Sequence, residues 1–209
     1  SVVVDWNAIA ITAVGAAAQN PTQQERSITI TSVAVSDAVN AITRKYSRYG
    51  SRLKPPADAS TISAAIGAAY RALTQHVPSQ TPFLDTMLSQ SLAKFGVNAG
   101  EPGFVFGEAV ADEIVVMRSA VGAAQAQYPY TPPNAGAPGV WVPTPPGFAA
   151  AAVPGWIFVQ PWVLKSAAQY RPDEGPDLTS ERYARDLNEV KELRALNSAT
   201  RTAEQTDIA

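Results

Sequence analysis

ITSVAVSDAVNAI, Ile30 to Ile42, is the stretch of sequence that decides the fold class. Its isoleucine, threonine and valine content is compatible with a β-strand, because β-branched side chains favour extended backbone. Its apolar residues nevertheless fall on one face at the three- and four-residue spacing of a helix, and the pattern starts near Thr22. A run of that length exceeds an ordinary strand, so the segment predicts a long helix.

The same periodicity is present on both sides of this segment. Asn20-Pro21 ends the first run, Pro78 ends the third, and Gly96 stands where a left-handed C-cap is expected. The sequence therefore predicts an all-α bundle of about six helices. They are expected from Asp5 to Gln19, from about Thr22 past Ile42, from Asp58 or Ser60 to His76, from Pro82 to Phe95, from just after Gly103 to about Gly122, and from Thr179 or Ser180 to Asn197.

A proline- and aromatic-rich segment separates the fifth and sixth predicted helices. Residues 128–177 hold 11 of the 17 prolines and three of the four tryptophans, which excludes regular helix or central strand over most of this length. The tryptophans predict an ordered arm that packs on a surface. The expected domains are a helical bundle over residues 1–127, the arm over 128–178, and helices over 179–209.

A capping-box pattern near the carboxyl end, Thr202 with Gln205, predicts that a further helix starts at Ala203. The sequence ends at Ala209, and a helix that short has no stability of its own. We therefore expect the polypeptide to continue, or to be a subunit of something larger. Ser1 in place of methionine fits either a boundary within a longer sequence or removal of a signal, and the latter predicts an exported, periplasmic or secreted protein.

The composition excludes several classes of function. Lys plus Arg is 16 and Asp plus Glu is 18, a net charge of -2, so no basic field is available to bind nucleic acid or anionic lipid. The absence of cysteine excludes disulfides, thiolate zinc sites and thiol nucleophiles. No apolar stretch is long enough to predict a membrane span.

His76 is the only histidine and lies in the last turn of the third predicted helix. A partly charged imidazole there would interact favourably with the helix dipole. A capping or surface role is favoured, because a nucleophilic triad or a metal site would need partners that the sequence lacks.

Asp5, Asp37 and Asn40 lie on otherwise apolar helical faces. Together they could form a carboxylate site for acid–base chemistry or for a hard cation. The favoured alternative is that these groups satisfy backbone donors of a neighbouring loop or pair with an arginine such as Arg26 or Arg44, because buried charge must be paired.

Two further charged groups also have structural interpretations. Glu108, Asp112 and Glu113 are expected on a solvated helix face with one buried member. Lys165 and Arg171 resemble the way cations are presented to an oxyanion, but no glycine-rich anion nest accompanies them, and packing of the arm is favoured. The sequence therefore assigns no catalytic, cofactor-binding or metal-binding residue.

Several blocks of sequence, in their order along the chain, carry a resemblance to a known family. They are VVVDWNAIAI (Val2–Ile11), SVAVSDAVNAI (Ser32–Ile42), GEAVADEIVVMR (Gly107–Arg118), PGVWVPTPPGF (Pro138–Phe148), QPWVLKSAAQYRP (Gln160–Pro172) and LTSERYARDLNEVKELRALNSATRTAEQTDIA (Leu178–Ala209). With these blocks the chain resembles the amino-terminal half of bacterial vanadium-dependent haloperoxidase-related proteins, in the type 2 phosphatidic acid phosphatase superfamily.

The resemblance implies two helical bundles, with the vanadate or phosphate pocket in the second. It therefore also implies that the helices over 179–209 lead into a missing carboxyl-terminal catalytic half. That family clamps the anion with a Lys, six residues and Arg-Pro, with Pro-Ser-Gly-His, and with an Arg followed five residues later by the axial His. None of these motifs occurs between Ser1 and Ala209, and Lys165 and Arg171 are separated by five residues rather than six. No family site residue can be transferred to this sequence, and vanadate is expected only in the missing half.

The resemblance further implies that this chain is the scaffold half of an enzyme that oxidises halide with vanadate and peroxide. Its partner would be the carboxyl-terminal half of the same protein, covalently continuous or as a separate chain. One alternative is a phosphatase-like relative with the same pocket. Another is a non-catalytic assembly or binding protein whose aromatic arm clasps a neighbouring subunit. A homo-oligomer is also expected.

Overall fold

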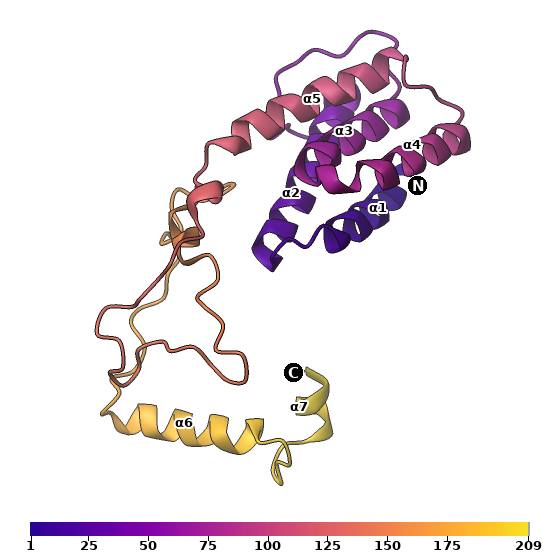
Figure 1. The fold of residues 1–209 in the computed structure, drawn as a ribbon. Coiled ribbons are helices and arrows are strands. Elements are labelled where there is room, and N and C mark those ends of the chain that lie inside the picture. Colours follow the sequence, from indigo (N-terminus) through magenta and orange to yellow (C-terminus); the bar gives the residue numbers. More distant parts are fainter. Residues whose placement is uncertain (209) are drawn as a thin grey trace. The chain divides into compact units, whose positions relative to one another are not determined.

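The structure is a computed structural model that describes residues 1–208, in which seven α-helices and no strand are found (Figure 1). The all-α class predicted from the sequence is confirmed. The chain divides into two compact units, Ser1–Ala123 and Ala124–Ala209. The first unit contains α1 (Val2–Ala16), α2 (Pro21–Thr43), α3 (Thr61–His76), the short 3-10 helix η1 (Pro78–Gln80), α4 (Thr81–Phe95) and α5 (Pro102–Ser119).

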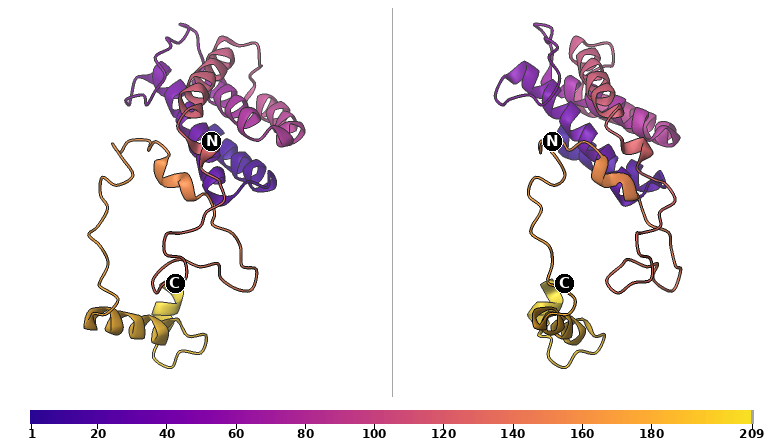
Figure 2. Two further views of the ribbon diagram at one scale, coloured as in Figure 1. Left: turned by 60° about the vertical axis from the view of Figure 1, so that its left-hand side comes forward. Right: turned by 90° about the vertical axis from the view of Figure 1, so that its left-hand side faces the viewer.

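Helix α3 is central to the first unit and contacts α1, α2, α4 and α5 (Figures 1 and 2). Its small side chains permit this position, since every residue from Ser63 to Ala69 is buried. A Cβ atom at Gly67 would collide with the carbonyl oxygen of Phe104, and one at Gly107 with the carbonyl oxygen of Ala64. The backbones of α3 and α5 are therefore in direct contact, which glycine alone permits at these positions.

The β-branched segment forms a helix, α2, as predicted from the length of its periodic run. It is continuous from Pro21 to Thr43, with proline in its first turn. Asn20 and Gln23 form a reciprocal capping box at its start. Its buried apolar stripe consists of Ile30, Ala34, Val35, Ala38 and Ala41.

Several predicted helix ends are also observed. Gly96 ends α4 with a left-handed φ of 65°, and α5 ends at Ser119, shortly before Gly122 with φ 89°. Thr202 and Gln205 make both reciprocal hydrogen bonds of the predicted capping box, at 3.1 and 2.9 Å. None of the helices in the described residues combines the length and apolar character of a membrane span.

The second unit contains little regular structure. The 3-10 helix η2 (Ala123–Gln125) lies at the boundary, followed by η3 (Pro154–Phe158), α6 (Glu181–Arg194) and α7 (Ala203–Ile208). The chain between η2 and α6 is otherwise irregular, and it is drawn in orange in Figure 1. This agrees with the exclusion of regular helix by its prolines.

The aromatic side chains of the arm differ in how far they are exposed. Trp141, Phe148 and Phe158 are 44%, 63% and 77% exposed. The rings of Tyr130 and Trp141 lie 6.5 Å apart, and no larger aromatic cluster is found in the described part of the arm. Trp156 and Trp162 are half-buried. The packing of the arm on a surface stays a prediction.

Candidate functional site

The loop between α2 and α3, residues 44–60, is held by one buried carboxylate. Asp37 of α2 is 1% exposed and accepts hydrogen bonds from the backbone N–H groups of Tyr49, Gly50 and Ser51, at 2.6, 2.7 and 2.8 Å. These donors replace the water that the carboxylate loses on burial. The predicted role of Asp37 as a buried tie to the backbone of a loop is confirmed.

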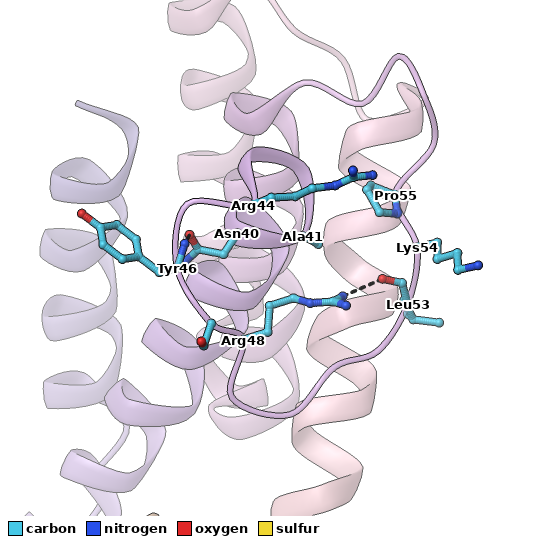
Figure 3. Close-up of a pocket in the computed structure, with 9 residues that line it drawn as sticks. Asn40, Ala41, Arg44, Tyr46, Arg48, Leu53, Lys54 and Pro55 are labelled. Carbon is cyan, nitrogen blue, oxygen red and sulfur yellow. Dashed lines mark hydrogen bonds between the residues drawn. The ribbon is translucent and has the colours of Figure 1, made fainter.

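The same loop and the end of α2 enclose an open pocket of about 490 Å³ (Figure 3). Three cationic residues line it, Arg44, Arg48 and Lys54, and no carboxylate does so in the described chain. Figure 3 shows Arg44 and Arg48 extending towards the segment that contains Leu53 and Pro55. Nη1 of Arg48 donates to the carbonyl oxygen of Leu53 at 2.7 Å.

Asp5 and Asn40 do not join Asp37 in a shared site. Asp5 on α1 forms an ion pair with Lys94 on α4, with 2.7 Å between Nζ and Oδ2, and the hydrogen bond from Lys94 lowers the pKa of Asp5. The side chain of Asn40 accepts from the backbone N–H of Tyr46 at 3.3 Å. The three residues thus serve separate contacts, and the structure does not assemble the carboxylate site that the sequence allowed.

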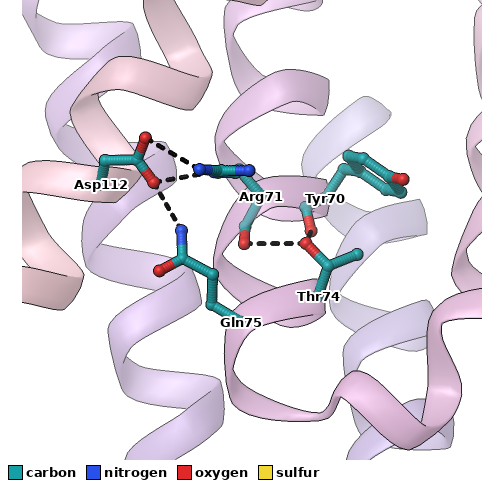
Figure 4. Close-up of polar contacts among 5 residues, drawn as sticks. All are labelled: Tyr70, Arg71, Thr74, Gln75 and Asp112. Atoms are coloured by element: carbon teal, nitrogen blue, oxygen red, sulfur yellow. Dashed lines mark hydrogen bonds and ion pairs between the residues drawn. The ribbon is translucent and has the colours of Figure 1, made fainter.

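An ion-pair network lies across α3 and α5 (Figure 4). Arg71 donates through two nitrogens to the two carboxylate oxygens of Asp112, at 2.7 and 3.3 Å, and Gln75 also donates to Asp112. Glu108 is half-buried, and burial raises its pKa. Asp112 and Glu113 are half-buried too, so the prediction of one buried member in this group is wrong. The acids stay at the edge of the interface, where residues of α3 reach them.

His76 lies in the last turn of α3, as predicted, but it is half-buried and its Nε2 is enclosed without a hydrogen-bond partner. Burial, and secondarily the charge of Arg26, lowers the pKa of His76 to about 4. The imidazole is therefore neutral near pH 7, and the predicted interaction of a charged imidazole with the helix dipole is wrong. The carbonyl oxygen of His76 instead accepts from Nε2 of Gln19 at 3.1 Å.

The residues of this chain do not fit a vanadate ion. Vanadate needs an accessible histidine nitrogen and several converging cations and N–H donors. Nε2 of His76 is enclosed, and Lys165 and Arg171 are both exposed in the arm. The cationic pocket at the end of α2 has no histidine in its lining, so it cannot supply the ligand that vanadate needs. No cluster of three or more His, Cys, Asp or Glu side chains that could hold a metal ion is found within residues 1–208.

The basic pocket is a feature that sequence reasoning missed, since the sequence predicts only a loop there. The available signal was RKYSRYGSRLK, Arg44 to Lys54, in which five residues are cationic and none is acidic. The sequence does not show that Asp37 ties the middle of this run to α2. That tie shapes the run so that Arg44 and Arg48 line one pocket.

Comparison with known proteins gives a likeness in fold. No protein-family model and no curated protein sequence matches the chain. Among solved structures, it matches the first bacterial vanadium-dependent iodoperoxidase with a TM-score of 0.73 and 23% sequence identity. The match covers 92% of this chain and 49% of that one, so this chain spans about half its length. In fold, the chain is therefore similar to half of a vanadium-dependent haloperoxidase.

Proposed function

We propose that this chain is the scaffold half of a vanadium-dependent haloperoxidase-like enzyme, which oxidises halide with hydrogen peroxide. The observation that carries the proposal is the structural match, which extends over 92% of this chain but 49% of the iodoperoxidase. In this proposal the other half supplies the vanadate pocket. The present chain supplies helices and the arm, because its own residues do not fit vanadate.

The unpartnered face of α6 supports the presence of a second half. Tyr183, Leu187 and Val190 recur at the spacing of one helical face, yet α6 has no buried residue. Leu187 and Val190 are among the exposed large apolar side chains. An amphipathic helix whose apolar face remains exposed is typical of a segment that packs against a further subunit or domain.

The proposal is tested on the native protein, purified through an affinity tag on this chain. We expect mass spectrometry to find a polypeptide, continuous with this chain or copurified with it, that contains the Arg-Pro, Pro-Ser-Gly-His and Arg-His elements. We expect the purified material, supplied with vanadate and peroxide, to oxidise iodide to triiodide, measured by absorbance. Recovery of these 209 residues with neither a covalent continuation nor such a partner would overturn the proposal.

The same purified material distinguishes a haloperoxidase from a phosphatase-like relative, through the reaction that it catalyses. In that case the histidine-containing half is found, but the material hydrolyses p-nitrophenyl phosphate and does not oxidise iodide, bromide or chloride in the presence of vanadate and peroxide. Vanadate would then inhibit the hydrolysis, because it resembles the transferred phosphoryl group.

A non-catalytic assembly role is the second candidate, and the exposed side chains of the arm favour it. Tyr128, Tyr130, Trp141, Ile157 and Phe158 line an open hollow of about 660 Å³ in the second unit. Exposed aromatic side chains are frequent anchors of protein interfaces. A stable homo-oligomer that lacks any histidine-containing partner, measured by light scattering and mass spectrometry, would favour this role over the enzyme.

A further inference from the structure

The pocket between the end of α2 and its following loop has an unusual concentration of positive charge for this chain. The protein as a whole carries a net charge of -2, yet Arg44, Arg48 and Lys54 line one pocket of about 490 Å³ without a carboxylate among its lining residues. Asp37, the acid of α2 that holds the loop, accepts hydrogen bonds from three backbone N–H groups and does not line the pocket. Asp58, the acid within the loop, does not line the pocket either, so the charged side chains that line the pocket are all cationic.

The carboxyl end of α2 does not cancel this charge. The end of a helix carries roughly half a negative charge, whereas the pocket holds three full positive charges. The exposed carbonyls there are also partly occupied, because the backbone N–H of Arg44 donates to the carbonyl oxygen of Asn40 at 2.9 Å. The local field in the pocket therefore favours an anion.

The loop and one of the two arginines, Arg48, are held in place before any ligand arrives. Asp37 anchors the loop, and Arg48 is fixed to the carbonyl oxygen of Leu53 through Nη1. Arg44 occupies a left-handed backbone conformation, with φ 56°, which directs its side chain from the end of α2 into the pocket. Such a conformation favours glycine or asparagine, so an arginine at this position is a departure from local preference.

We propose that this pocket binds a small phosphate-type oxyanion, either inorganic phosphate or the phosphate group of a small monoester. The guanidinium groups of Arg44 and Arg48 would each donate to its oxygens, and Lys54 would contribute charge at the rim. The volume of the pocket exceeds that of one phosphate, which leaves room for a monoester. This site lies wholly within the first unit and does not depend on the proposed second half.

The test is titration of the 209-residue chain with sodium phosphate and, separately, with phenyl phosphate, followed by isothermal calorimetry and by backbone amide NMR. The chloride concentration is adjusted to keep ionic strength constant, because weak non-specific attraction is screened by salt. We expect saturable binding with amide shifts confined to residues 44–55. Tighter binding of phenyl phosphate would identify a monoester as the ligand, and preference for inorganic phosphate would identify the free ion.

Arg44→Asn is the informative variant, because asparagine tolerates the left-handed conformation and the loop keeps its shape. We expect it to weaken phosphate binding by about tenfold or more, through loss of charge-assisted hydrogen bonds. Arg52→Gln is the matched control: Arg52 is an exposed cation of the same loop that does not line the pocket. It should bind phosphate within about twofold of the unaltered chain.

The melting temperature of each variant shows whether weaker binding results from loss of a ligand contact or from loss of folding. Arg44→Asn is expected to melt at or above the temperature of the unaltered chain. The proposal is overturned if neither ligand saturates, if the amide shifts are spread over the whole surface, or if Arg52→Gln weakens binding as much as Arg44→Asn. The last result would show general charge attraction instead of a site.

Discussion

At the scale of single residues, two buried polar groups of the first unit have opposite surroundings. The carboxylate of Asp37 accepts three backbone hydrogen bonds, whereas Nε2 of His76 has no partner. Arg26 lies near His76, and burial, followed by the charge of Arg118, lowers the pKa of Arg26 as well. The surroundings of Asp37 therefore stabilise a charged side chain, whereas those of His76 disfavour one.

The penalty at His76 predicts how stability depends on pH. The pKa of His76 falls from 6.5, its ordinary value, to about 4 in the folded chain. Between these values the unfolded chain binds a proton that the folded chain does not, so stability decreases as pH falls below 6.5. From pH 7.5 to pH 5.5 this one group should cost at most about 1.4 kcal/mol of unfolding free energy.

Urea unfolding followed by circular dichroism checks this value in the unaltered chain and in His76→Gln, which removes the titrating group. The free energy of unfolding of the unaltered chain should fall more steeply between pH 7.5 and pH 5.5. Above pH 7 the two pH profiles should be parallel, because the imidazole is then neutral in both the folded and unfolded states. Parallel profiles over the whole range would contradict the argument.

At the scale of elements, the first unit depends on the close approach of α3 and α5. Gly67 and Gly107 place the backbone of each helix against a carbonyl oxygen of the other. This approach lets the small side chains of α3 fill the centre of the bundle, where larger residues would leave the helices further apart. The polar pair Arg71 and Asp112 joins the same two helices at their exposed edge.

Alanine at either glycine is therefore expected to be strongly destabilising. Gly67→Ala and Gly107→Ala should each lower the free energy of unfolding by about 3 kcal/mol, because the added methyl group meets backbone that cannot move independently. Gly15→Ala is the matched control. Gly15 lies in α1 with no atom near the added Cβ, so this change should raise stability by about 0.5 kcal/mol.

Chemical unfolding of the three variants measures these differences. An effect of Gly67→Ala or Gly107→Ala no larger than that of Gly15→Ala would show that α3 and α5 are not in backbone contact.

At the scale of the whole molecule, the two units differ in how much of their chain is buried. Most residues of α3 are buried, whereas no residue of α6 or α7 is. A helix of 14 residues that buries no side chain is marginally stable in water. The first unit therefore has the core of a stable bundle, and the second has exposed surfaces available to a partner.

Hydrogen exchange followed by mass spectrometry should report this difference in the isolated chain. Peptides from α6 are expected to exchange on the order of a hundredfold faster than those from α3, because α6 can open without exposing a core. Equal protection of α6 and α3 would contradict this. If the native protein contains the proposed second half, the amides of α6 should exchange more slowly there than in the isolated chain.

Local signals in the sequence determined where the helices lie. Helical spacing identified α2 despite its β-branched residues, Gly96 marked the end of α4, and the prolines of residues 128–177 excluded α-helix over most of that length. These features act over one or two helical turns, so neighbouring residues are enough to reveal them. The likeness in fold to half of a vanadium-dependent haloperoxidase was also recognisable from the blocks of sequence.

Only the tertiary structure decided the contacts between distant residues. It showed that Asp37 binds the loop up to Ser51, that His76 is neutral, and that Arg44 and Arg48 line one pocket. It also showed that Trp141, Phe148 and Phe158 of the arm are exposed, whereas Trp156 and Trp162 are half-buried. Burial and electrostatic surroundings depend on which other elements cover a residue, and that information lies in the packing of the helices and not in the local pattern of the chain.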